Sequence, residues 1–194
     1  MTYKSCKTRQ SAERQRHIVD CLAQMLIEMP FEAITVQALC EKAQVPRKTF
    51  YRYFDGKDAV FTALTDQIML DYEQYTGPYA EGEKRTSEKE MEKMFLFWYE
   101  HRELLSAIVR SNMTGLTLEQ FMETGYAERL GKRLVNLPEL EDDSKIFRMT
   151  TFFTTSGLFV ILLDWLRRGC EESPKEMAAM TVQLLTRPLY RALP

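Results

Sequence analysis

Cationic and aromatic side chains alternate in the short segment that follows Pro46. In a helix, Phe50 and Phe54 would share one stripe, and Lys48 and Arg52 would share the opposite one. The aromatic stripe should face a core, whereas the cationic stripe should be exposed among tyrosine and threonine hydroxyls. Guanidinium and ammonium groups bind guanine edges and phosphates, so the pattern predicts a helix that enters the major groove of DNA.

Two groups of side chains are predicted to share this contact with DNA. Lys57 follows the Asp55-Gly56 break and begins the next predicted helix, where its ammonium and the free N–H groups could hold a phosphate. The alternative is a solvated charged helix, which accounts for the cations but not for two exposed tyrosines between them. The predicted base-reading residues are Arg47, Lys48, Tyr51 and Arg52, and the predicted backbone-holding residues are Thr35, Gln37, Thr49, Tyr53 and Lys57.

Two short helices joined by a tight turn, over residues 34–54, would position these side chains. Thr35 is a suitable N-cap for the first helix. Pro46 suits the first position of the second helix, because its backbone angle is already helical. A scaffold helix over 11–29, capped by Ser11, should precede the pair, and a helix over 57–75 should follow it.

The sequence around this turn carries a longer motif. Its end resembles the N-terminal helix-turn-helix of the TetR family of transcriptional regulators. Gln44 departs from the pattern, because the family usually carries glycine there, and a left-handed glutamine costs on the order of 1 kcal/mol. The motif is Thr49-Phe50-Tyr51-Arg52-Tyr53-Phe54-Asp55-Gly56-Lys57-Asp58-Ala59-Val60.

The resemblance implies an all-α fold. The helical segments of the sequence number about nine. An N-terminal three-helix bundle with the helix-turn-helix would occupy residues 11–75, and a helical domain for effector binding and dimerisation would occupy residues 76–194. The Gly-Pro loop that begins at Thr76 separates them. Residues 1–60 carry ten Lys and Arg against seven Asp and Glu, and the remainder carries 16 against 21, so a basic head precedes an acidic body.

The C-terminal half should contain helices over 87–101, 102–112, 116–134, 144–168 and 174–185. Ser173-Pro174 with Glu176 reads as a capping box, and Gly169 as a helix stop. This half resembles a TetR branch that includes dihydroxyacetone-kinase-operon regulators, on Gly157, Trp165-Leu166, Gly169 and residues 173–178. That resemblance is specific to a subfamily and says little about a ligand.

Two further sets of C-terminal residues are candidates for function. The resemblance implies that the last two long helices pair with those of a second copy, and both sets have the alternative of packing in the monomer's own core. The predicted ligand-pocket residues are Phe95, Trp98, Tyr99, Phe121, Met149, Phe152 and Phe153. The predicted dimer-interface residues are Thr151, Thr155, Leu158, Leu162, Met177, Met180, Thr181 and Leu184.

The sequence shows no sign of an enzyme or of a metal or other cofactor site. It has no G-x-S-x-G elbow, no glycine-rich phosphate loop, no paired carboxylates against a cleft and no metal-ligand spacing of His and Cys. No secretory signal is visible, and the apolar run Thr150–Leu163 is shorter than the roughly 20 residues of a membrane-spanning helix. A cytoplasmic location is therefore expected, without a membrane partner.

The expected partners are double-stranded DNA, a second copy of the chain, and a small-molecule or protein effector. The function that best accounts for these residues is an effector-responsive dimeric repressor that binds a palindromic operator. Two alternatives with the same fold are a transcriptional activator and a helical adaptor that binds only protein.

Overall fold

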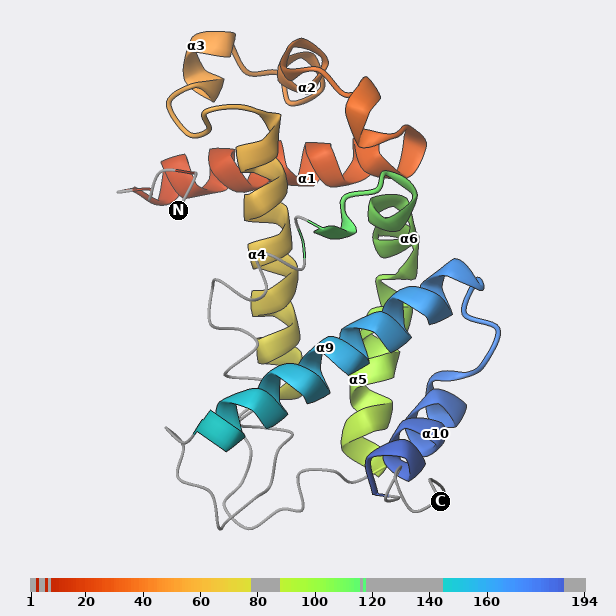
Figure 1. The fold of residues 1–194 in the computed structure, drawn as a ribbon. Coiled ribbons are helices and arrows are strands. Elements are labelled where there is room, and N and C mark those ends of the chain that lie inside the picture. Colours follow the sequence, from red (N-terminus) through yellow and green to blue (C-terminus); the bar gives the residue numbers. More distant parts are fainter. Residues whose placement is uncertain are drawn as a thin grey trace. The chain divides into compact units, whose positions relative to one another are not determined.

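The computed structural model describes residues 3, 6, 8–77, 88–115, 117 and 145–186. Within these ranges the chain forms helices and no strand, and the predicted all-α fold is confirmed (Figure 1). The predicted helix over 116–134 and most of the loop after Thr76 lie outside the described residues. The elements are α1 (Arg9–Glu28), a 3-10 turn η1 (Phe31–Ala33), α2 (Val36–Lys42), α3 (Arg47–Phe50), α4 (Lys57–Thr76), α5 (Glu88–Glu100), α6 (Arg102–Arg110), α9 (Lys145–Arg167) and α10 (Pro174–Thr186).

The described residues fall into two compact units. One contains the chain up to Glu73 together with residues from Glu103 to Thr117, and the other contains residues from Gln74 to Arg102 and from Lys145 onward. The first unit therefore includes most of α6 as well as the helix-turn-helix. This grouping follows spatial contact, whereas a functional division of the chain at residue 76 stays a prediction.

The N-terminal unit is built on the apolar stripe of α1. Ile18, Leu22 and Leu26 recur every four residues and are all buried, as their spacing predicts. The cap of α1 differs from the prediction. Thr8 is the N-cap, and Ser11 is the third helical residue, whose hydroxyl and backbone N–H complete a capping box with Thr8. The helix therefore begins at Arg9, earlier than the apolar pattern alone indicates.

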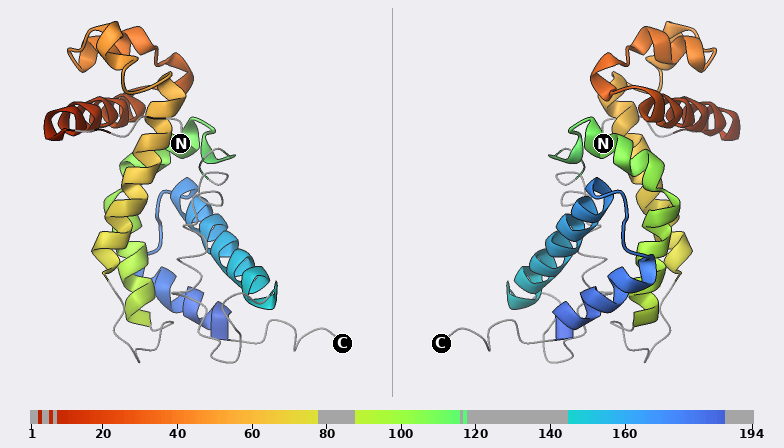
Figure 2. Two further views of the ribbon diagram at one scale, coloured as in Figure 1. Left: turned by 90° about the vertical axis from the view of Figure 1, so that its left-hand side faces the viewer. Right: turned by 90° about the vertical axis from the view of Figure 1, so that its right-hand side faces the viewer.

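The C-terminal unit is organised around Trp165, which is fully buried. The ring of Phe95 on α5 meets the Trp165 indole edge-on at 5.4 Å between ring centres, and the Tyr99 ring lies 6.0 Å away. Helix α5 also packs along α10, as the two further views of the ribbon show (Figure 2). Aromatic side chains from α5 and α9 thus form the centre of this unit.

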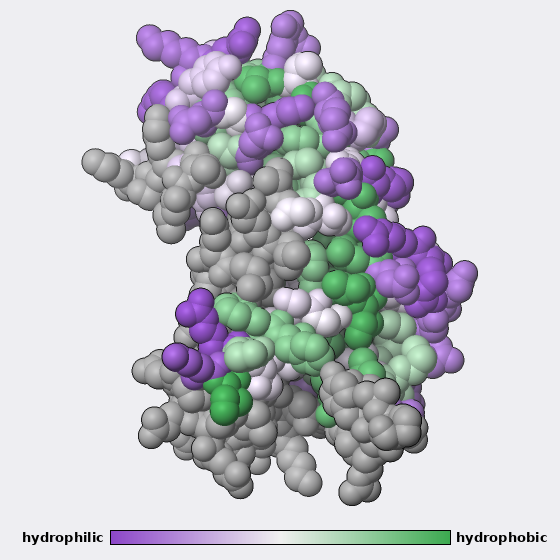
Figure 3. Space-filling model, in the orientation of Figure 1, coloured by the Kyte–Doolittle hydropathy of each residue, from purple (hydrophilic) through white to green (hydrophobic). Residues whose placement is uncertain are grey.

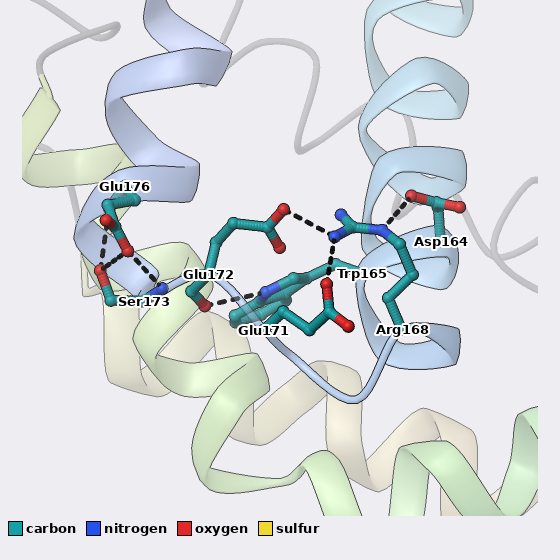
Figure 4. A network of polar contacts seen from close by, with 7 residues as sticks. All are labelled: Asp164, Trp165, Arg168, Glu171, Glu172, Ser173 and Glu176. Carbon is teal, nitrogen blue, oxygen red and sulfur yellow. Dashed lines mark hydrogen bonds and ion pairs between the residues drawn. The ribbon is translucent and has the colours of Figure 1, made fainter.

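A polar network fixes the connection from α9 to α10 (Figure 4). The Trp165 Nε1–H donates to the Glu172 backbone carbonyl at 3.0 Å, and the Arg168 guanidinium bridges Asp164 and Glu172 at 2.9 and 2.6 Å. Gly169 is left-handed with φ +75°, which confirms it as the helix stop. The chain therefore turns sharply from one helix into the next.

The predicted capping box at the start of α10 is confirmed. Ser173 Oγ accepts a hydrogen bond from the Glu176 N–H, while the Glu176 carboxylate accepts from the Ser173 N–H at 2.8 Å and from its hydroxyl at 2.7 Å. The Ser173 N–H, followed by its hydroxyl, holds the pKa of Glu176 below its ordinary value. The Arg168 guanidinium lowers the pKa of Glu172 in the same loop.

Helix α9 has two apolar faces, and the core uses the one predicted to form the dimer interface. Thr151, Thr155, Leu158 and Leu162 are all buried inside the chain's own unit. The opposite face exposes Ile146, Met149, Phe153 and Val160, which follow one another at spacings of three, four and seven residues. A helix that is apolar nearly all round permits both arrangements, so the residue pattern did not show which face would be internal.

Helix α9 has 23 residues and, by length and composition alone, is long and apolar enough to cross a membrane. The helix is longer than the apolar run Thr150–Leu163, because it continues on both sides of that run. Of its most apolar window 28% is buried, and core helices of water-soluble proteins can meet the same criterion of length and composition.

In the space-filling view, apolar and neutral side chains predominate along α9, and hydrophilic ones gather around α2 and α3 (Figure 3).

Candidate nucleic-acid interface

The turn between α2 and α3 depends on one left-handed residue. Gln44 has φ +53°, as the departure from the glycine of the motif predicted. Its N–H donates to the Glu41 carbonyl at 3.2 Å, and the Val45 N–H donates to the Cys40 carbonyl at 3.0 Å. These two bonds close the end of α2 and direct the chain into Pro46. Pro46 is the N-cap of α3 in an extended conformation, one residue before the predicted position.

Thr35 caps the other helix of this pair, as predicted. Its hydroxyl oxygen accepts the Ala38 N–H at 3.1 Å, which leaves the hydroxyl hydrogen available as a donor. Gln37 is exposed on the next position but one, and its amide donates to the Glu41 carboxylate at 3.0 Å. Both residues lie at the start of α2, and a role in holding the DNA backbone stays a prediction.

Helix α3 is shorter than predicted and rests on two buried rings. The regular helix spans four residues, after which the Arg52 N–H donates to Thr49 and the Tyr53 N–H to Phe50 in tighter, 3-10-type turns. Phe50 and Phe54 are fully buried, and their ring centres lie 5.8 Å apart. The predicted division into an aromatic inner stripe and a polar outer one is therefore present.

All four predicted base-reading side chains are exposed, as direct readout requires. The Tyr51 side chain beside Arg47 raises the pKa of that guanidinium above its ordinary value. The Tyr51 ring, 43% exposed, meets Phe50 edge-on at 5.4 Å between centres. Lys48 on α3 and Arg52 in the turn that follows it are the other exposed cations of this segment.

Two of the predicted backbone-holding residues need correction. Tyr53 is only 5% exposed, so it is a core residue rather than the second exposed tyrosine that the helical wheel indicated. The tighter turns after Phe50 rotate it inward relative to a regular helix. Thr49 is half-buried. Its position on α3 permits a phosphate contact, which stays a prediction.

The Lys57 ammonium binds the protein's own backbone instead of an open phosphate site. Its Nζ donates to the carbonyls of Phe31 at 2.8 Å and Ile34 at 2.9 Å, with Glu32 at 3.4 Å. The same ammonium lies 4.4 Å from the centre of the Phe31 ring. An ammonium has three N–H donors, so these carbonyls use all of them. We therefore assign Lys57 to the junction of η1 and α4, and its predicted phosphate contact is revised.

A surface hollow of about 580 Å³ lies between α2 and α3. Glu41 lines it and was absent from the sequence-based set, although its spacing of four from Gln37 places both on one face of α2. A carboxylate at this position can accept a hydrogen bond from the amino group of cytosine. The lining residues are Gln37, Cys40, Glu41, Gln44, Val45, Pro46 and Arg47.

The predicted ligand-pocket residues do not share one environment, because some are buried and others are exposed. Phe95 and Trp98 are buried, and Tyr99 and Phe152 are half-buried. Met149 and Phe153 are 72% and 71% exposed, so they lie on the surface and do not line a cavity. Phe121 lies outside the described residues. The edge-on contact of fully buried Phe95 with Trp165 is that of a packed core, which was the alternative interpretation of this set.

An exposed cationic α3, held on a buried aromatic pair behind a left-handed turn, defines a helix-turn-helix regulator. Two family matches agree with this class. Residues 18–64 match the bacterial regulatory proteins of the tetR family, and residues 85–187 match the family described as transcriptional regulator C-terminal region. The second match alone covers more than half of the sequence. The chain belongs to the TetR family of transcriptional regulators.

Solved structures with the same fold include the fatty acid degradation regulator FadR from Bacillus halodurans, with a TM-score of 0.66 and 18% identity over 96% of this chain and 99% of that one. A TetR-family regulator from Syntrophomonas wolfei gives 0.66 and 16% over 93% and 98%. The dihydroxyacetone kinase operon activator DhaS gives 0.58 and 16% over 89% and 93%. DhaS belongs to the branch that the C-terminal half resembles, and these identities show a shared fold alone.

Curated relatives match a shorter part of the chain. The nucleoid occlusion factor SlmA of Shewanella sp. strain W3-18-1 and that of Shewanella putrefaciens are 38% identical over 55 residues. This match covers 28% of the chain and 28% of each relative. The similarity therefore concerns a segment the size of a helix-turn-helix domain.

Proposed function

We propose that this TetR-family regulator is an effector-responsive repressor that binds a palindromic operator as a homodimer in the cytoplasm. One observation supports the DNA contact above all: Arg47 and Lys48 on α3 and Arg52 in the turn after it are exposed, while fully buried Phe50 and Phe54 fix the inner side of the same segment. A rigid base orients the cations, and the cations supply both affinity for phosphates and hydrogen bonds to guanine.

We call the exposed residues proposed to contact DNA the reader. It contains fewer residues than the sequence predicted. Arg47, Lys48, Tyr51 and Arg52 are proposed to read bases, and Thr35, Gln37 and Thr49 to hold the backbone. Tyr53 and Lys57 are proposed to support the reader from inside the domain, because their polar or aromatic groups are buried or already bonded.

The proposed homodimer uses the exposed face of α9 rather than the predicted one. Met149, Phe153 and Val160 form its centre, and a Cβ added at Gly157 would meet nothing within 4 Å, so a partner helix could approach closely there. On α10, Met180 and Leu184 are 47% and 40% exposed and join this face, whereas Met177 and Thr181 of the predicted set are buried and are left out of it. A two-fold pair would place the two readers about 34–36 Å apart, on successive turns of the major groove.

Residues 76–194 are proposed to bind the effector, and a small molecule and a protein are both compatible with the fold. The half-buried Tyr99 and Phe152 are the pocket candidates that remain, because the fully buried ones belong to the core and the exposed ones to the proposed interface. Binding of the effector would change the distance between the two readers and thereby release the operator.

Selection of duplexes from a random pool tests this proposal without knowledge of the operator. The wild-type protein should enrich an inverted repeat, and a gel shift at two salt concentrations should show weaker binding at higher salt. Sedimentation should show the dimer at the same concentrations. A protein that enriches no sequence, or that enriches a single half-site as a monomer, would contradict the proposal.

A further inference from the structure

The turn η1 joins α1 to α2, and side chains from outside the turn satisfy its backbone groups. Its carbonyls accept hydrogen bonds from Lys57, the first residue of α4. The Phe31 ring also lies 5.5 Å from the ring of Phe61 on the same helix. Contacts with α4 therefore hold one side of η1. Because Thr35 caps α2 directly after η1, any shift of η1 moves the helix-turn-helix that follows.

The N–H of this turn is bonded to a residue far along the chain. The Phe31 N–H donates to the Ser111 hydroxyl oxygen at 3.1 Å, across 80 residues of sequence. Both groups are buried, and Ser111 is 3% exposed. The first N–H of a helical turn has no acceptor within the turn itself, so the Ser111 hydroxyl supplies the one that Phe31 needs.

The backbone around Ser111 is itself held in place. The Ser111 N–H donates to the Ala107 carbonyl at 3.0 Å, Asn112 adopts a left-handed φ of +54°, and the Met113 N–H donates to the Ile108 carbonyl at 3.2 Å. These bonds form a helix C-terminal cap in which the residue after α6 is fixed relative to the helix. The Ser111 hydroxyl consequently moves with α6 as a rigid part of it.

We propose that Ser111 is a positioning residue for DNA recognition, and that its hydrogen bond to Phe31 fixes η1 and thereby the helix-turn-helix that follows it. Two side chains form hydrogen bonds to η1: Lys57, the first residue of α4, and Ser111, the residue after α6. The first belongs to the DNA-binding helices themselves, and the second is the route by which α6 sets the orientation of α2 and α3. This inference rests on the proposed function, because it assigns a residue to the DNA binding proposed above.

The variant Ser111→Ala tests this role, with a duplex enriched by the wild-type protein and a scrambled duplex of equal length. All measurements are made where circular dichroism shows each protein fully folded. The charges of the protein do not change, so non-specific binding to the scrambled duplex should be unaltered. Affinity for the enriched duplex should fall about tenfold, because a misoriented reader loses base contacts first.

Two control variants separate positioning from general loss of a buried hydroxyl. Ser111→Thr keeps the acceptor oxygen and should retain most of the specific affinity. Thr65→Val removes another buried hydroxyl of the same unit, which donates within α4 to Phe61 and Thr62, and it should leave the ratio of specific to non-specific binding unchanged. Equal loss on both duplexes, or no loss on either, would overturn the assignment of Ser111.

Hydrogen exchange of the wild-type protein gives a second measurement that does not depend on the variant folding. The Phe31 amide should exchange about tenfold more slowly when the enriched duplex is bound, because coupling between two sites is reciprocal. Unchanged exchange at Phe31 would overturn the inference. If the wild-type protein enriches no duplex, the proposed function itself fails; if it enriches one and Ser111→Ala binds it equally well, only this inference fails.

Discussion

The variant Lys57→Met distinguishes two roles for Lys57, a bond to the protein's own backbone and a contact with a DNA phosphate. Methionine keeps most of the stem that lies against the Phe31 ring but removes the ammonium, so the Phe31 and Ile34 carbonyls lose donors at 2.8 and 2.9 Å. Hydrogen bonds to a charged group contribute about 1.5–3 kcal/mol each when buried. Lys57 is half-buried, and water can replace part of the loss, so we expect the free energy of unfolding to fall by about 2–3 kcal/mol.

Chemical denaturation at a fixed protein concentration measures this change directly. Thermal unfolding gives a second measurement. For a chain of this length, each kcal/mol of stability corresponds to about 2–4 °C, so the melting temperature should fall by roughly 4–12 °C. The slope of DNA affinity against salt should remain that of the wild type, because no phosphate contact is lost. An unchanged stability with a salt slope reduced by about 1 would refute the assignment and restore the phosphate role.

Three further changes test separate parts of the structure. Arg47→Ala should weaken binding to the enriched duplex by about 1–3 kcal/mol and relax sequence preference at one position, measured by gel shift on single-base variants. Phe153→Glu should shift sedimentation toward monomer with little loss of monomer helicity, because the ring is 71% exposed and lies at the centre of the proposed interface. Acidification should weaken the start of α10 through Glu176: its folded-state pKa is lowered, so its contribution is present above the ordinary carboxyl pKa and is lost as the pH falls through the folded value. Glu176→Gln should remove this acid-dependent component from denaturation curves.

Each of these three predictions has a control or a result that would contradict it. Equal loss for Arg47→Ala on enriched and scrambled duplexes would contradict base reading. Leu158→Ala, on the buried face of α9, should lower monomer stability instead of changing only the oligomeric state. A Phe153→Glu protein that remains dimeric would contradict the proposed interface. An acid transition that is identical in wild type and Glu176→Gln would show that this capping box does not titrate with folding.

Local features of the sequence predicted the helices and several of their ends. The caps at Thr35 and Ser173, the stop at Gly169 and the left-handed Gln44 all depend on residues within a few positions of one another. The inner stripe of α3 followed from the spacing of Phe50 and Phe54. Interactions of this range leave a periodic or chemical signal that a reader of the sequence can detect.

The long-range contacts of the candidate site could not be predicted in this way. Nothing near Lys57 indicates that its acceptors lie 23 and 26 residues earlier, and nothing near Ser111 points to Phe31. Tyr53 was misplaced because the chain leaves the regular helix after Phe50. Helix α9 carries apolar residues on both sides, and only its neighbours in space decide which side becomes internal.

The exposed apolar face of α9 has a consequence for the dose of this regulator. If the chain must dimerise before it binds both half-sites, the concentration of dimer rises with the square of the total chain concentration as long as most copies are monomers. Halving synthesis would then remove about three quarters of the competent pairs, by mass action alone. A gene under such control would respond steeply to modest changes in the supply of its regulator.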